Sequence, residues 1–141
     1  MAGWYSRLAQ WLRRLRAEKP LEVRGEAAAA RFLKGLGYRI LARRARSKLG
    51  EIDLVALDGQ SIVFVEVKTR EVADEFSPGE AVDRAKQQRL TRLALAYLNR
   101  HGLLEAQARF DVVAVTWPPG ARRPTIRHDV NAFEAAGNWS F

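Results

Sequence analysis

The sequence predicts an α/β fold in three layers, with a central mixed β-sheet between helices. Three observations lead to this prediction. Residues 62–65 are all apolar, so both faces of that strand need cover. Two β-rich runs meet at Asp58-Gly59, which is a strong hairpin signal. Segments with helical spacing stand before and after these strands. The 141 residues are enough for one domain with its own core.

The first expected element is a short basic amphipathic helix over residues 3–17. Its apolar stripe consists of Trp4, Leu8, Trp11, Leu12 and Leu15, and its arginines lie mostly off that stripe. Lys19-Pro20 ends the helix. A helix of this kind could lie on a membrane surface or on nucleic acid. We expect it instead to pack against the body or a second subunit, and we divide the chain into residues 1–20 and a domain over residues 21–141.

The domain is expected to begin with a second helix over residues 24–36, because Gly37 is a good C-terminal stop. A strand over residues 38–44 should follow. The two hairpin strands are expected over residues 51–57 and 61–69, where apolar and β-branched side chains dominate.

A long helix is expected after the hairpin, ending near His101-Gly102. Two starts are open, a capping box at Ser77 and an N-cap at Asp83. We favour Asp83, because the Ser77 start would place a glycine in the first turn. A strand over residues 109–117 and an edge strand over residues 125–130 complete the expected sheet.

The composition restricts the chemistry. The chain has no cysteine, which removes disulfides, thiolate zinc sites and thiol nucleophiles. It has only His101 and His128, so a histidine-rich metal site is not expected. A metal here would be held by oxygen, which indicates Mg²⁺ or Mn²⁺.

The net charge of +8 is unevenly distributed. Residues 1–50 carry 13 Lys/Arg against 3 Asp/Glu, a balance of +10, and residues 51–141 carry 11 against 13, a balance of −2. This asymmetry suggests a polyanionic partner, and solvated arginines that only maintain solubility are an equal alternative. No apolar run approaches a membrane span, and the N-terminus lacks the apolar run of a signal peptide, so a cytoplasmic location is expected.

Charged side chains gather where the two hairpin strands end. By strand alternation, Glu51 and Asp53 share a face on the first strand, and Glu66 and Lys68 share a face on the second. A two-residue turn at Asp58-Gly59 would place Asp53 near Phe64, within about one pleat of Glu66. The groups therefore converge only if the register brings their faces together.

Such a cluster has a chemical use. Two neighbouring carboxylates in a partly buried sheet resist ionising together, and a divalent cation resolves their repulsion. The negative field would keep Lys68 protonated, so it is suited to orienting water and offsetting phosphate charge rather than to acting as a base. The alternative is a surface ion pair between Glu66 and Lys68. The apolar neighbours favour a site at the strand end.

The segment Gly50-Glu51-Ile52-Asp53-Leu54, followed by Val63-Phe64-Val65-Glu66-Val67-Lys68-Thr69-Arg70, resembles the signature of the YraN-type family of small bacterial proteins. That family resembles archaeal Holliday-junction resolvases and the restriction-endonuclease-like superfamily. The similarity runs from Arg24 to Phe133 and includes Gly25-Glu26, Gly37-Tyr38 and Arg109-Phe110-Asp111. The resemblance implies a restriction-endonuclease-like sandwich.

The resemblance also implies residue roles. Asp53 and Glu66 would ligate the metal together with the Val67 carbonyl, Lys68 would be the catalytic lysine, and Glu26 would complete the site through metal-bound water. Glu51 is a weaker candidate. Lys86 and Arg89 match basic helix positions that could face the substrate backbone, and an ordinary solvated lysine is an equal alternative for Lys86. Further candidates for nucleic-acid contacts are Arg44, Arg46, Lys48 and Arg70. Asp111 is expected to be structural, pairing with Arg109 or capping a turn.

Three functions are consistent with these features. The first is a Mg²⁺- or Mn²⁺-dependent endonuclease that hydrolyses DNA, with branched DNA as one candidate substrate. The second is a nucleic-acid-binding module with the nuclease fold and little turnover. The third is a non-catalytic protein that docks through its N-terminal helix. The Asp53, Glu66 and Lys68 set favours the first, and the resolvase resemblance suggests a homodimer because junction enzymes need two active sites.

Overall fold

A computed structural model of the protein describes residues 2–15, 19–73 and 78–136. In chain order the elements are α1 (Ala2–Leu15), α2 (Leu21–Gly35), β1 (Arg39–Ser47), β2 (Gly50–Asp58), β3 (Ser61–Arg70), the 3₁₀ helix η1 (Gly79–Ala81), α3 (Arg84–Arg100), β4 (Ala108–Thr116) and β5 (Thr125–Phe133).

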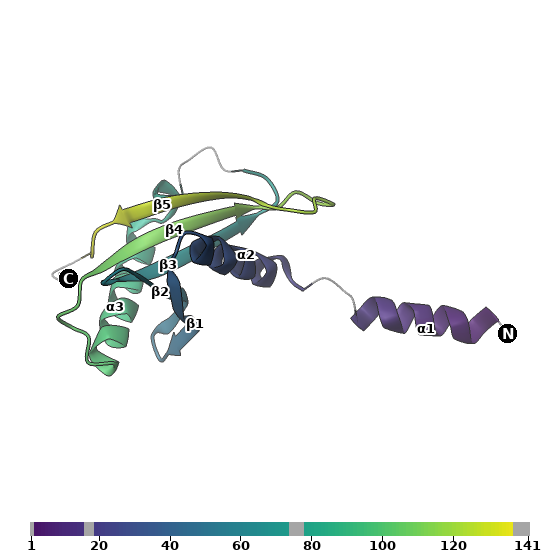
Figure 1. Ribbon diagram of the computed structural model, residues 1–141, viewed down its shortest axis with the longest axis horizontal. Coiled ribbons are helices and arrows are strands. Elements are labelled where there is room, and N and C mark those ends of the chain that lie inside the picture. The colour runs from purple at the N-terminus through teal and green to yellow at the C-terminus, as the bar shows by residue number, and fades with distance from the viewer. Residues whose placement is uncertain (1, 16–18, 74–77, 137–141) are drawn as a thin grey trace.

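The five strands form one mixed sheet in the order β1-β2-β3-β4-β5. Strands β3 and β4 run parallel, and the other neighbouring pairs are antiparallel. A parallel pair needs a crossover connection, and α3 supplies it. Helix α2 covers one face of the sheet and α3 covers the other (Figure 1). The predicted three-layer α/β/α sandwich is therefore confirmed.

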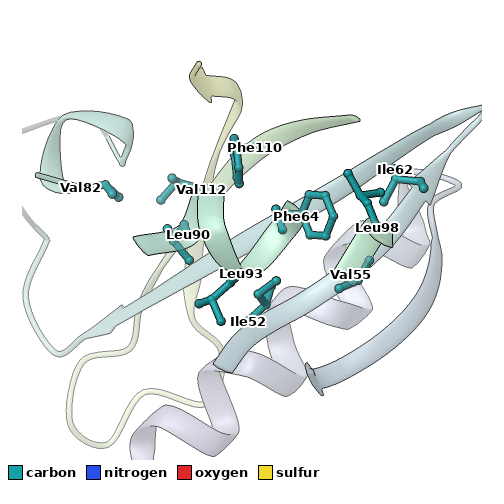
Figure 2. Packing of buried hydrophobic residues seen from close by; sticks show 11 residues of the cluster. Ile52, Val55, Ile62, Phe64, Val82, Leu90, Leu93, Leu98, Phe110 and Val112 are labelled. Carbon is teal, nitrogen blue, oxygen red and sulfur yellow. The ribbon is translucent and has the colours of Figure 1, made fainter. Parts of the chain in front are cut away.

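The core on the α3 side is built from large side chains. Leu90, Leu93 and Leu98 of α3 pack against Phe64 and other buried residues of the sheet (Figure 2). The rings of Phe64 and Phe110, on the parallel strands, lie 5.9 Å apart between centroids. This packing accounts for the all-apolar run in β3, since its other face is covered equally by α2.

The core on the α2 side begins with a very close approach. A Cβ atom built on Gly25 would lie 1.9 Å from Oγ1 of Thr69, so only glycine lets α2 reach the end of β3. The next turns of α2 present Ala28, Ala29 and Leu33, all buried, to the sheet. The small side chains keep the helix near the strands and bring its first turns beside the charged end of β3.

The hairpin register differs from the predicted one. Asp58 pairs with Ser61 and Leu57 with Ile62, so the turn is Gly59-Gln60 and the predicted pairing of Leu57 with Gln60 was wrong. Gly59 has a φ of +60°. A glycine at the first central position suits a two-residue hairpin turn, whereas a turn at Asp58-Gly59 would have required Asp58 to leave the ladder. Each β2 residue therefore lies opposite a β3 residue two positions later than predicted, which brings Asp53 closer to Glu66.

Several element boundaries also differ by a few residues. The side chain of Asp83 accepts the backbone N–H of Lys86 at 2.8 Å, which confirms it as the N-cap of α3. The alternative start at Ser77 lies outside the described residues. Helix α2 begins at Leu21, earlier than expected, because Pro20 fits the position just before a helix. Strand β5 is longer than predicted and reaches Phe133, since its ladder with β4 continues past an irregularity.

Helix α1 was expected over residues 3–17, and residues 16 and 17 lie outside the described part. It stands apart from the sheet and its covering helices in Figure 1. The large apolar side chains described for it are exposed, namely Trp4, Tyr5, Leu8, Trp11 and Leu12. The expectation that this stripe packs against the body was therefore wrong, whereas packing on a second subunit stays a prediction. None of the described helices has the length and apolar character needed to cross a membrane.

Candidate active site

A polar cavity of about 300 Å³ opens where β3 ends, between the first turns of α2 and α3. Its walls come from α2, β2, β3 and α3. The lining residues are Glu22, Glu26, Asp53, Glu66, Val67, Lys68, Thr69, Arg70 and Lys86. All four residues that the sequence proposed as catalytic lie in this wall. One cavity thus collects side chains from helices on both faces of the sheet.

Asp53 and Glu66 come from neighbouring strands. Leu54 lies opposite Val65 in the ladder, so the next position along each strand holds one of these two carboxylates. Asp53 accepts the backbone N–H of Val67 on its Oδ2 at 2.8 Å. This bond fixes the Asp53 carboxylate against the backbone of β3, beside Glu66, which is only 8% exposed.

A break in strand alternation separates Asp53 from Glu51. Ile52 and Val55 both pack in the core on the α3 side, although regular alternation would place them on opposite faces. Glu51 pairs with Arg46 at 3.2 Å and does not line the cavity. The predicted shared face of Glu51 and Asp53 was therefore wrong. Irregular strand positions re-aim side chains in this way and are common beside active sites.

The electrostatics of the carboxylate pair are unfavourable. Burial raises the pKa of Asp53 to about 7, and the neighbouring Glu66 carboxylate adds to the rise. The N–H of Val67 opposes it, and Glu26 contributes a smaller repulsion. Two carboxyl groups held this close do not both ionise easily near neutral pH without a compensating cation.

The two lysines of the cavity contact different partners. The ammonium group of Lys86 forms an ion pair with Oε1 of Glu66, and that of Lys68 donates to the carbonyl of Ala81 in η1. The sequence had placed Lys68 beside the carboxylates and Lys86 toward the substrate backbone. The structure brings Lys86 onto a carboxylate directly, which excludes its interpretation as an ordinary solvated lysine.

Glu26 lies in the cavity wall and forms an ion pair with Arg44. Nε of Arg44 donates to its Oε2 at 2.9 Å. Arg44 has a φ of +49°, a left-handed conformation that is uncommon for a residue other than glycine. The irregular backbone of β1 thus delivers a positive charge from the sheet edge to a carboxylate of the candidate site.

The other basic candidates are distributed around the cavity. Arg70 lines it, and its Nη1 donates to the Thr69 carbonyl at 2.9 Å. Arg46 is held by Glu51. Arg89 and Lys48 are exposed and do not line the cavity. Of the six residues predicted to contact nucleic acid, only Lys86 and Arg70 are therefore part of the cavity wall.

Comparison with known proteins identifies the family. The sequence profile described as "Uncharacterised protein family UPF0102" matches residues 25–115. The chain belongs to the UPF0102 family. This confirms the YraN-type resemblance seen in the sequence. The matched segment contains every residue proposed as catalytic and does not include α1.

Individual UPF0102 relatives match along most of their length. The chain is 50% identical over 119 residues to a UPF0102 protein of Geobacter sulfurreducens, covering 84% of this chain and 91% of that one. It is 54% identical over 111 residues to a UPF0102 protein of Symbiobacterium thermophilum, covering 79% and 93%. Among solved structures, Pyrococcus furiosus SfsA in complex with Ca²⁺ shows a likeness with a TM-score of 0.37 and 15% identity, covering 78% of this chain and 62% of that one.

The donor set of the cavity fits a hard divalent cation. Within residues 2–15, 19–73 and 78–136, no three His, Cys, Asp or Glu side chains lie close enough together to hold a metal. The site could offer two carboxylates, Asp53 and Glu66, and the Val67 carbonyl. Mg²⁺ is often held by one or two carboxylates while it keeps several waters, so this sparse oxygen set suits it and the related Mn²⁺.

Sequence reasoning missed two cavity residues. Glu22 lies four positions before Glu26 in α2, so helical periodicity alone puts it on the same face. Thr69 faces Gly25 across the contact between helix and strand. The resemblance had brought Glu26 to the site, but the approach of Gly25 to Thr69 is a tertiary feature that periodicity does not predict.

Proposed function

We propose that the protein is a divalent-metal-dependent endonuclease that hydrolyses DNA phosphodiester bonds, with Asp53, Glu66 and Lys68 as its central residues. The observation that carries the proposal is the pair of partly buried Asp53 and buried Glu66 on adjacent strands, with two lysines in the same cavity. A cost in stability comes with forcing two carboxyl groups together. Structural ion pairs do not need this arrangement, whereas a cation site does.

The chain's own residues would each have a defined task. Asp53, Glu66 and the Val67 carbonyl would hold the cation. When bound, the ion would supply Lewis-acid activation of a water molecule and of the phosphate. Lys68 would orient the attacking water and offset charge on the phosphate, and Lys86 would provide a second positive group at the same place. Glu26, which Arg44 orients, would accept a hydrogen bond from water in the cavity wall.

DNA is the substrate that fits the charge distribution. The first 50 residues have a balance of +10 and contain β1, whose Arg44 contacts Glu26 in the cavity wall. Phosphate contacts from Lys86, Arg89, Arg44, Arg46, Lys48 and Arg70 would fix the backbone across the site. Branched DNA is proposed from the family resemblance to junction resolvases, and it would require two copies of the chain acting together.

A cleavage assay tests the proposal. Purified protein is incubated with linear, nicked and four-way-junction DNA in Mg²⁺, Mn²⁺ or EDTA. We expect cleavage that depends on the metal and is lost in Asp53→Ala and Glu66→Ala. Glu51→Gln is the matched control, because it removes a carboxylate from the same strand that does not line the cavity. Cleavage by both site variants would contradict the residue assignment.

Calorimetry separates catalysis from binding. The wild-type protein should bind Mn²⁺, and Glu66→Ala should bind it at least about tenfold more weakly. Metal-dependent binding of DNA without cleavage would identify a nucleic-acid-binding module with the nuclease fold. If the wild type binds no divalent ion even with DNA present, the proposed chemistry is wrong.

A further inference from the structure

Helix α1 presents an apolar face that the described part of the chain leaves exposed. Trp4, Leu8 and Trp11 recur at helical spacing, so they lie on one side of the helix. Tyr5 and Leu12 widen that side, and the rings of Trp4 and Tyr5 lie 4.0 Å apart between centroids. Five large apolar side chains exposed on a single short helix make a continuous patch. Such patches mark interaction surfaces.

The charge of α1 restricts the partner. Residues 2–15 contain Arg7, Arg13 and Arg14 and no Asp or Glu. Arg7 lies outside the apolar stripe in helical spacing. The surface that α1 fits is therefore apolar where the Trp and Leu side chains contact it and negatively charged around that contact.

An anionic lipid surface meets both conditions, whereas DNA and a second copy of α1 each meet only one. DNA offers phosphates, yet its surface gives four or five exposed Trp, Tyr and Leu side chains nothing apolar to bury against. A second copy of α1 offers an apolar face, but it carries the same arginines and brings like charges together. Interfacial helices combine Trp and Leu on one face with Arg or Lys on the other and no acidic excess.

The described length of α1 bears on its orientation relative to a bilayer. With 14 residues, it is about 21 Å long at about 1.5 Å per residue. This is shorter than the roughly 30 Å hydrocarbon core of a bilayer. No helix in the described part of the chain is long and apolar enough to cross a membrane, so α1 would lie in the plane of the interface. Trp rings favour this depth, because the ring is apolar and its N–H can stay hydrated.

We propose that α1 is a membrane-surface anchor that binds anionic lipid bilayers through Trp4, Leu8 and Trp11, with its arginines at the headgroups. The anchor is separate from the cavity, because the family match begins at residue 25 and the cavity residues come from α2 onward. The inference therefore stands apart from the proposed nuclease function. It would keep the domain beside the membrane whatever reaction the cavity performs.

Vesicle binding tests the anchor. The full chain is sedimented with phosphatidylcholine vesicles and with vesicles that also contain phosphatidylglycerol. We expect sedimentation with the anionic vesicles that decreases as salt is added, and a blue shift of tryptophan fluorescence. The double variant Trp4→Ser/Trp11→Ser should bind at least about tenfold more weakly. Arg7→Gln should weaken binding to anionic vesicles and leave any binding to neutral vesicles unchanged.

Matched controls and competing outcomes keep the test sharp. Leu104→Ser removes a side chain that is 52% exposed, close to the 55% of Trp11, but lies outside α1 and should bind vesicles like the wild type. No binding of the wild type to anionic vesicles would overturn the proposal. So would loss of DNA affinity or of a dimer in Trp4→Ser/Trp11→Ser, measured by fluorescence anisotropy and sedimentation velocity, if vesicle binding were unaffected.

Discussion

Two aspartates of this sheet, Asp111 fully buried and Asp53 partly buried, have pKa values shifted in opposite directions. Burial alone would raise the pKa of Asp111, but hydrogen bonds with His128 and Arg109 and with the backbone of Asn131 hold it below its usual range. Asp53 has one backbone donor and a carboxylate neighbour, and its pKa rises to about 7. A buried carboxylate with enough donors is structural, whereas one left short of positive partners is prepared for a ligand.

The Asp53 carboxyl group should make stability depend on pH in an unusual direction. Between pH 3.8 and about 7, the folded protein holds a proton that the unfolded chain has released, so stability falls as pH rises through this window. Asp53→Asn removes this cost, and we expect it to stabilise the metal-free protein by about 2–4 kcal/mol above pH 7. Urea unfolding in EDTA measures the difference, which should vanish near pH 4. Equal stabilities at both pH values would contradict it.

Asp111 should behave in the opposite way. Its carboxylate is fully buried and bonds to Arg109 at 3.0 Å and His128 at 2.8 Å. Asp111→Asn should cost about 3–5 kcal/mol in urea unfolding, because Arg109 loses its buried partner. Asp58→Asn is the control, since Asp58 pairs with the same Arg109 but is well exposed, and it should cost under about 1 kcal/mol. The stabilising effect of Asp111 is present above pH 3.8 and is lost as pH falls below that, through its lowered pKa.

Lys86 should compete with a metal for Glu66. Its ammonium group is the counter-ion of that carboxylate, so a cation bound there must displace or repel it. We expect Lys86→Met to raise the affinity for Mn²⁺ about tenfold in calorimetry, because the variant no longer places a positive charge on the Glu66 carboxylate. Arg89→Met removes a charge one turn later in α3, outside the cavity, and should change the affinity much less. Equal effects of the two variants would show that Lys86 acts only through general charge.

At the scale of elements, the periodic patterns were sufficient for prediction and the local geometry was not. The apolar run in β3 and the Asp83 cap gave the sandwich and the start of α3 because both depend on neighbours in sequence. The hairpin register depended on which two residues form the turn, and these are Gly59 and Gln60 rather than Asp58 and Gly59. The break in alternation near Asp53 and the approach at Gly25 involve separate segments. No single stretch of sequence encodes them.

The contact between α2 and β3 should depend on Gly25. Gly25→Ala would place a Cβ atom 1.9 Å from Oγ1 of Thr69, so the helix must move away from the strand. We expect a loss of about 1–3 kcal/mol in unfolding experiments and weaker Mn²⁺ binding, because Glu26 moves with the helix. Gly35→Ala is the control in the same helix, where an added Cβ meets nothing within 4 Å. It should be neutral or stabilise by up to about 1 kcal/mol.

For the whole molecule, charge is arranged around one end of the sheet. Lys48 lies in the turn between β1 and β2, at the start of β2. Because β2 and β3 are antiparallel, the start of β2 and the end of β3 at Arg70 lie at the same end of the sheet. The N-terminal part of α3 reaches the cavity there through Lys86, and the exposed Arg89 follows one turn later in the helix. The sequence predicted a polyanion partner from totals alone, and the fold explains how scattered basic residues could act together.

This arrangement predicts which arginines contribute to the salt dependence of DNA binding. The logarithm of DNA affinity should fall linearly with the logarithm of salt concentration, and each lost phosphate contact should reduce that slope by about 1. Arg89 lies near the end of α3 that faces the cavity, so Arg89→Gln should reduce the slope. Arg100→Gln lies at the other end of the same helix, about 16 Å away at about 1.5 Å per residue, and should leave it unchanged. Fluorescence anisotropy over a salt series measures both. If both variants reduced the slope equally, DNA would contact the length of α3 rather than the edge that holds Asp53 and Glu66.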